Sequence, residues 1–144
     1  VKGALSFVLE HAANPEKWIF PDYRSGPEGF DLWAEALAQG RANRFGQGFN
    51  DEVWAECRAA AVGFLREAKQ RLAGSADSLF DEAIGHYSIV ASRLKALRDL
   101  HPFRGVRTGE DQQLKSPEGA ALIREAASAE RKGLEVLARL VPAL

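Results

Sequence analysis

The chain has 144 residues, of which 46% are hydrophobic and 27% are charged, the proportions of a globular domain with a single core. Its formal net charge is −1, and its Lys and Arg residues are dispersed among Asp and Glu. No strong field would therefore attract nucleic acid or an acidic membrane, and we expect neither as a partner.

A single cysteine, Cys57, excludes an intrachain disulfide and indicates a reducing compartment such as the cytoplasm. No apolar run approaches the ~20 residues that span a bilayer, and the first twelve residues lack the apolar core of a signal peptide. The chain contains no methionine. We therefore expect one domain over residues 1–144 of a larger protein, with residues 1–24 as a candidate linker or tail of an upstream domain.

Apolar residues recur at spacings of three and four, which predicts helices throughout and no strands. A first helix is predicted over about residues 2–12, followed by a loop rich in Pro, Gly and aromatic residues, "NPEKWIFPDYRSGPEG". Ser25 and Glu28 then form a capping box, with Pro27 in the first turn. The helix that they open carries Phe30 and Trp33 on one face and ends at Gly40.

Two longer helices are predicted next. The stretch "RANRFGQGF" indicates a second aromatic loop, after which Asn50 would cap a helix with Asp51 and Glu52 in its first turn and Gly74 at its end. Ser75 or Asp77 would begin the following helix, which reaches about Leu100. Its predicted inward seam consists of Phe80, Ala83, Tyr87, Val90, Leu94 and Leu97.

A polar connection, "PFRGVRTGEDQQLK", leads to a last helix that begins at Ser116 and Pro117 and is closed by Pro142. Its predicted seam consists of Ile123, Ala127, Glu130, Leu134, Leu137 and Val141. Three helices of about 24 residues are each about 36 Å long, and short connections favour antiparallel neighbours. The sequence therefore predicts an all-α, up-and-down bundle of four to five helices.

Aromatic residues are concentrated in the first 54 positions: Trp18, Phe20, Tyr23, Phe30, Trp33, Phe45, Phe49 and Trp54. The stretches "GFDLWAE" and "GFNDEVWAE" both place an aromatic residue just before a Trp-Ala-Glu triplet, the arrangement of a hydrophobic staple at a helix start. We favour this structural role. The alternative is that the aromatic residues line a ligand cleft at one end of the bundle.

Metal binding is not expected from the spacing of the histidines. Di-iron bundles use a Glu followed three residues later by His, and none of His11, His86 and His101 has an acidic residue three positions before it. The HExxH zinc spacing is also absent, and Glu82 with His86 is a pairing typical of ordinary helix surfaces. No cofactor is indicated.

Glu130 interrupts an apolar seam and so requires a partner or access to water. Arg58 or His86 would supply the partner if their helices are neighbours, whereas an edge position would let the carboxylate reach solvent, and we favour the latter. Glu56 and Arg58 are candidate members of a semi-buried polar cluster, while Glu52 is expected to be solvated. Glu56→Ala should then cost more stability than Glu52→Ala.

No complete active site is visible in the sequence. Cys57 is predicted to lie on the apolar side of a helix and away from its N-terminus, where its pKa would be lowered. Neither a nucleophile elbow nor a glycine-rich phosphate loop occurs. We assign no catalytic residue, and the isolated chain is not expected to be catalytic.

Three stretches, "YRSGPEGFDLWAEALAQG", "FGQGFNDEVWAECRAAAVGFLREA" and "FDEAIGHYSIVASRLKALRDLHPF", resemble a helical region of uncharacterised bacterial proteins. Those proteins are related to the N-terminal domain of the butirosin-biosynthesis acyltransferase and to peptidase-C39-like cysteine proteins. The resemblance covers about residues 20–135. It implies a helical segment downstream of a papain-like domain, whose catalytic Cys and His would lie upstream of Val1. Cys57 matches no nucleophile motif. The positions that carry the resemblance are Phe30, Trp33, Trp54, Glu56, Arg58, Phe64, Leu65, His86, Tyr87, Pro102 and Phe103.

These observations favour a helical accessory or ligand-binding domain attached to an upstream cysteine-protease-like or acyltransferase-like domain. Its candidate binding or polar-cluster residues are Trp33, Trp54, Glu56, Arg58, His86, Tyr87 and Glu130. One alternative is a free-standing bundle that binds a small molecule or metal. Another is a module that forms a homodimer through small residues of the last helix, namely Ala120, Ala121, Ala126, Ala129 and Gly133.

Overall fold

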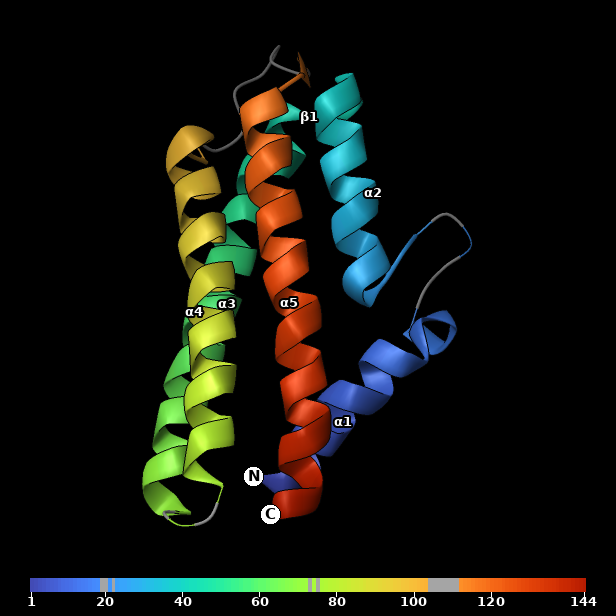
Figure 1. Ribbon diagram of the computed structural model, residues 1–144. Coiled ribbons are helices and arrows are strands. Elements are labelled where there is room, and N and C mark those ends of the chain that lie inside the picture. Colours follow the sequence, from blue (N-terminus) through green and yellow to red (C-terminus); the bar gives the residue numbers. More distant parts are fainter. Residues whose placement is uncertain (19–20, 22, 73, 75, 104–111) are drawn as a thin grey trace.

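The computed structural model describes every residue of the chain except 19–20, 22, 73, 75 and 104–111. Its described residues form five α-helices, one short 3₁₀ helix and two strands of two residues each, so the predicted all-α bundle is confirmed (Figure 1). In chain order the elements are α1 (Lys2–Ala13), η1 (Pro15–Trp18), α2 (Gly26–Gln39), β1 (Ala42–Asn43), α3 (Arg44–Arg71), α4 (Asp77–Leu100), β2 (Gln113–Leu114) and α5 (Pro117–Ala143).

The three long helices run up and down beside one another, as their matched lengths predict. Helix α4 packs against both α3 and α5, while α2 packs on α5 from the other side. Figure 1 shows α5 between α4 and α2. Helix α1 crosses the C-terminal end of α5, where the two chain termini lie close together. We call this end the terminal end of the bundle, and the opposite end, which holds β1, the β1 end.

The buried apolar side chains form two clusters along the bundle. The cluster at the β1 end joins α2 to the long helices and includes Phe30, Leu37, Leu94, Leu97 and Ile123. The cluster at the terminal end replaces α2 with α1 and includes Leu5, Leu65, Phe80, Leu137 and Leu140. Each short helix therefore covers one half of a frame made by α3, α4 and α5.

Helix α3 begins two turns earlier than predicted, and residues 44–49 are helical rather than a loop. Asn43, not Asn50, is the N-cap, and its Oδ1 accepts the Gly46 N–H at 3.1 Å. The glycines that suggested a loop have a packing reason instead. A Cβ at Gly48 would lie 3.2 Å from the Phe103 Cα and 3.3 Å from the His101 carbonyl oxygen, so glycine lets α3 approach the end of α4.

The other helix ends agree more closely with the sequence. Helix α4 buries all six residues of its predicted seam and ends before His101. Ser116 caps α5, because its Oγ accepts the Gly119 N–H at 3.1 Å. Ser25 is the N-cap of α2, but its side chain makes no capping hydrogen bond, so the predicted capping box is not formed. Pro142 lies inside the last turn of α5 rather than after it.

A two-residue antiparallel bridge, which the sequence analysis did not anticipate, pairs Ala42 with Leu114 and Asn43 with Gln113. It ties the α2–α3 connection to the segment that enters α5. Most of the predicted polar connection over residues 102–115 falls on 104–111, outside the described residues.

The small residues of α5 point into the bundle and are not available to a second copy of the chain. Ala121 is exposed, but the other four residues proposed for a dimer face are buried, namely Ala120, Ala126, Ala129 and Gly133. Their size permits close helix packing: a Cβ at Gly133 would lie 2.8 Å from the Tyr87 ring. The predicted dimer face is therefore wrong.

Candidate functional site

An ion pair between α3 and α5 lies at the junction of the two apolar clusters. The Nε and Nη2 groups of Arg58 donate to the two carboxylate oxygens of Glu130, each at 2.9 Å. The side chains are 18% and 8% exposed, respectively. Glu130 thus finds its partner in Arg58 rather than in water, and the edge position favoured from the sequence is wrong.

Aromatic rings surround the Arg58 guanidinium. Its Cζ lies 4.9 Å from the centre of the Trp54 ring and 5.9 Å from that of Phe30, within the range of cation–π attraction. Tyr87 of α4 completes the group: burial, and next the charge of Glu130, raise the pKa of its hydroxyl, while Arg58 opposes this shift. We call these five residues, Phe30, Trp54, Arg58, Tyr87 and Glu130, the Arg58 cluster.

A second polar arrangement extends from the edge of this cluster toward the β1 end. The Trp33 indole N–H donates to Gln47 Oε1 at 2.9 Å, and Gln47 Nε2 donates to Asp51 Oδ1 at 2.7 Å. Asp51 Oδ2 lies 3.4 Å from His101 Nδ1, and neither of these two buried atoms has a hydrogen-bond partner among the described residues. We call the four residues the Trp33–His101 chain.

Asp51 is fully buried, at 0% exposure. Burial raises the pKa of its carboxyl group above 3.8, because the charged form loses its hydration, while the nearby His101 and a hydrogen bond from Gln47 act in the opposite direction. The prediction that Asp51 lies in the first turn of its helix is wrong. Helix α3 starts at Arg44, which places Asp51 in its interior and on its inward face.

Five of the seven candidate residues come together: Trp54, Arg58, Tyr87 and Glu130 in the Arg58 cluster, and Trp33 beside it, with its ring 6.2 Å from that of Phe30. Glu56 and His86 do not join them. Glu56 is exposed, and His86 is half-buried without a hydrogen bond or ion pair to the part of the chain that the structure describes. Residues two apart on a helix point to opposite sides, so Arg58 and Glu56 cannot share a face.

The expectation that Glu56→Ala costs more stability than Glu52→Ala rested on burial of Glu56, and this premise is wrong. Glu52 is the half-buried one of the two, and its carboxylate lies 3.9 Å from Arg98. Four further residues belong to these two arrangements but were not predicted from the sequence, namely Phe30, Gln47, Asp51 and His101. A helix started at Asn43 would have placed Gln47, Asp51, Trp54 and Arg58 on adjoining positions of one face, at spacings of three and four.

Helix α3 exposes several large apolar side chains. Phe45, Phe49, Val53, Trp54 and Phe64 are between 38% and 50% exposed. Phe45 and Phe49 also contact Phe103, with ring centres 5.4 and 6.0 Å apart. Cys57 is exposed on the same helix, contrary to the predicted apolar environment. We call the set Phe45, Phe49, Val53, Trp54, Cys57 and Phe64 the α3 face.

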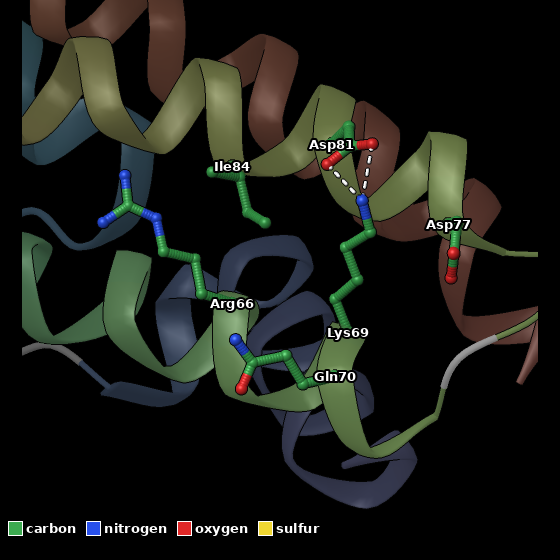
Figure 2. A pocket seen from close by; sticks show the side chains of 6 residues that line it. All are labelled: Arg66, Lys69, Gln70, Asp77, Asp81 and Ile84. Atoms are coloured by element: carbon green, nitrogen blue, oxygen red, sulfur yellow. Dashed lines mark hydrogen bonds and ion pairs between the residues drawn. The ribbon is translucent and has the colours of Figure 1, made fainter.

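An open depression of about 400 Å³ lies between α3 and α4 near the terminal end, lined by Arg66, Lys69, Gln70, Asp77, Asp81 and Ile84. Figure 2 shows Lys69 reaching across it to Asp81, with Nζ at 2.6 and 2.7 Å from the two carboxylate oxygens. Its other polar side chains extend separately from the two helices (Figure 2). None of the candidate residues lines this depression.

Among the described residues, no group of three or more His, Cys, Asp or Glu side chains is arranged to hold a metal ion. No helix in that part of the chain is both long and apolar enough to cross a membrane. No protein-family model matches the chain, and searches of curated proteins and of solved structures likewise give no significant match.

Proposed function

We propose that the chain is a non-catalytic helical binding domain, and that the α3 face is its contact surface for another protein domain. The observation that carries the proposal is the exposure of five large apolar side chains on one helix, four of them within its first three turns. Single exposed apolar residues are normal on any protein, but a contiguous group usually marks an interaction site.

The Arg58 cluster supplies the polar part of such an interface. A guanidinium group has five N–H donors, and Glu130 takes two of those on Arg58. The remaining donors belong to a side chain that is still partly exposed beside Trp54, which is 40% exposed. Trp, Tyr and Arg are the residues that most often dominate protein interfaces, because each combines a large apolar area with a directed donor.

The proposed occupant of the face is an upstream domain of the same polypeptide, of the cysteine-protease-like or acyltransferase-like class. The resemblance of residues 20–135 to a helical region downstream of a papain-like domain supports this choice. A tethered domain needs only modest intrinsic affinity, because the linker raises its effective concentration. The partly exposed ion pair and aromatic rings fit such a contact.

Cys57 offers a direct test, because it is exposed, lies on the α3 face and is the only cysteine in the sequence. The rate of maleimide labelling is measured at the peptide that contains Cys57, by mass spectrometry, on this chain alone and on the complete polypeptide that its gene encodes. Reading this one peptide separates Cys57 from any cysteine of the upstream domain. We expect labelling in the complete polypeptide to be slower by about tenfold, the factor given by 1.4 kcal/mol of preferential occlusion.

The matched control is Ser128→Cys in a Cys57→Ser background, because Ser128 is exposed on α5. Its labelling should be the same in the short chain and in the complete polypeptide. Equal rates for Cys57 in the two proteins would contradict the proposed face. A complete polypeptide without an additional upstream domain would contradict the proposed occupant.

A further inference from the structure

We infer that protonation of His101 is coupled to the position of the Trp33 indole through Asp51 and Gln47, so that the β1 end of the bundle is a pH-sensitive element. The contacts of the Trp33–His101 chain carry this inference, and they do not depend on what binds the α3 face.

The unsatisfied atoms define the sensitive point. Asp51 Oδ2 and His101 Nδ1 face each other at 3.4 Å, both buried and both without a hydrogen bond to the part of the chain that the structure describes. This separation is longer than the 2.7–2.9 Å of a charge-assisted N–H···O bond. A protonated imidazole carries a proton on Nδ1 and would donate it to the Asp51 carboxylate in such a bond, which shortens the contact. The neutral Nε2–H tautomer has no proton on Nδ1 to donate and leaves the contact long.

Packing holds the His101 imidazole in place, so the Asp51 carboxylate is the group that moves when the contact shortens. A Cβ added to Gly119 would lie 2.8 Å from His101 Cε1, and one added to Gly48 would lie 3.3 Å from the His101 carbonyl oxygen. The ring and backbone of His101 are thus held between the first turn of α5 and the first turns of α3. Asp51, whose other oxygen accepts a hydrogen bond from the Gln47 side-chain amide, is the partner that adjusts.

The remaining contacts transmit this adjustment to Trp33. Rotation of the Asp51 carboxylate moves Oδ1, which holds Gln47 Nε2 at 2.7 Å, and the Gln47 amide in turn orients the Trp33 indole N–H at 2.9 Å. Gln47 is buried, at 3% exposure, so water does not readily replace either bond. Trp33 borders the Arg58 cluster, so the change at His101 extends as far as the edge of that cluster.

The other charged groups on the packed elements are engaged elsewhere or lie at the surface. On α3 and α4, Glu52 and Asp99 both lie near Arg98, at 3.9 and 3.2 Å from its guanidinium group. On α5, Glu118 is exposed in the first turn. Helix α2 contributes apolar Leu37, which also contacts the first turn of α5 near Gly119. Among the described residues, Asp51 is the carboxylate that faces His101.

The experiment is an NMR titration of the ¹⁵N-labelled chain between about pH 5 and 8, the range in which histidine usually changes charge. It follows the ring protons of His11, His86 and His101 together with the indole N–H of Trp33, which is assigned with Trp33→Phe. In the wild type we expect the Trp33 indole signal to shift with the same midpoint as the His101 ring protons. The indole signal of Trp54 should not shift with that midpoint.

Two variants test the route. Asp51→Asn keeps the shape but removes the charge that responds to His101, and Gln47→Met removes only the link to Trp33. We expect the shared midpoint to disappear in both, and to persist in the control variants Glu56→Gln and His86→Gln. Gln47→Met leaves Asp51 and His101 in place, so it decides the outcome if Asp51→Asn does not fold.

Three results would overturn the inference. In the first, the Trp33 signal is constant while His101 titrates. In the second, it follows His11 or His86 instead of His101. In the third, His101 keeps a single protonation state over the whole range. Since the titration contains no partner domain, none of these results bears on the proposed interface.

Discussion

At the scale of single residues, the Arg58–Glu130 pair shows why a charge in an apolar seam persists. Two hydrogen bonds of 2.9 Å and two neighbouring rings compensate for the water that the charges have lost. Removing one partner leaves the other buried and uncompensated, which costs more than the intact pair contributes.

We therefore expect Glu130→Gln to lower the free energy of unfolding by about 2–4 kcal/mol, less than the largest values for buried pairs because Arg58 keeps some access to water. Urea denaturation gives this value. Glu125→Gln is the matched control, because its pair with Arg93 has side chains that are 55% and 41% exposed, and its loss should stay below about 1 kcal/mol. Similar losses for the two variants would contradict the account.

Asp51 predicts a pH dependence whose sign follows from its raised pKa. Because the pKa of its carboxyl group is higher in the folded chain than its ordinary value of 3.8, the folded state binds more protons than the unfolded state between these two values. The stability contributed by protonated Asp51 is fully present below 3.8 and is lost as pH rises through the raised pKa.

Asp51→Asn removes this contribution. We expect the free energy of unfolding of the wild type, minus that of the variant, to decrease as pH rises from about 3.8. Urea midpoints at half-unit pH steps measure this difference, in which the other titrating groups largely cancel. A difference that increases with pH over this window would show that His101 and Gln47 outweigh the effect of burial.

At the scale of helices, two glycines that both lie inside a long helix should respond oppositely to alanine, because one is buried and the other exposed. A Cβ at Gly133 of α5 would lie 2.8 Å from Tyr87 Cε2, whereas one at Gly63 of α3 would meet nothing within 4 Å. We expect Gly133→Ala to destabilise the fold by about 1–3 kcal/mol through overpacking. Gly63→Ala should stabilise it by about 0.5–1 kcal/mol through helix propensity. Thermal or urea melts of the two variants check both signs, and a stabilising Gly133→Ala would contradict the close packing of α4 on α5.

The sequence predicted α4 and α5 well because their periodicity and end signals agree. All six seam residues of α4 are buried, and Ser116 caps α5. The start of α3 was predicted wrongly because Gly46 and Gly48 have low helix propensity, while the reason for Gly48, the approach of His101 and Phe103, lies more than fifty residues away in the sequence. Tertiary packing overrides local propensity at this point.

The candidate site was predictable where one helix face carried it and unpredictable where helices had to be placed relative to one another. Tyr87 and Glu130 could be assigned from the seams of their own helices. The pairing of Glu130 with Arg58, rather than with His86 or solvent, depends on the distance between α3 and α5, which no local pattern encodes. The wrong assignment of Glu56 to the site could have been avoided from the sequence. The helical period alone excludes Glu56 from the face that carries Arg58.

At the scale of the whole molecule, the Arg58–Glu130 pair lies between two apolar clusters that are covered by different short helices. Helix α1 contributes a single buried residue, Leu5, to the cluster at the terminal end. Apolar clusters separated by a polar junction can open separately, in the way that cooperative sub-regions do in native-state hydrogen exchange.

We expect Leu5→Ala to cost about 2–3 kcal/mol, as truncations of buried leucine do, and to act on one half of the bundle. Hydrogen exchange should accelerate at the amides of Leu65, Phe80 and Leu137, which belong to the same cluster as Leu5, while Leu94 and Ile123 at the β1 end remain as protected as in the wild type. Val8→Ala on α1 is the control, because Val8 is 39% exposed and its truncation should leave exchange unchanged.

Equal acceleration in both halves would mean that the ion pair does not divide the core and that the bundle opens as one unit. Acceleration confined to the terminal end would instead show that the two apolar clusters open independently of each other. The division of the core by the ion pair would then affect the stability of the bundle as well as its structure.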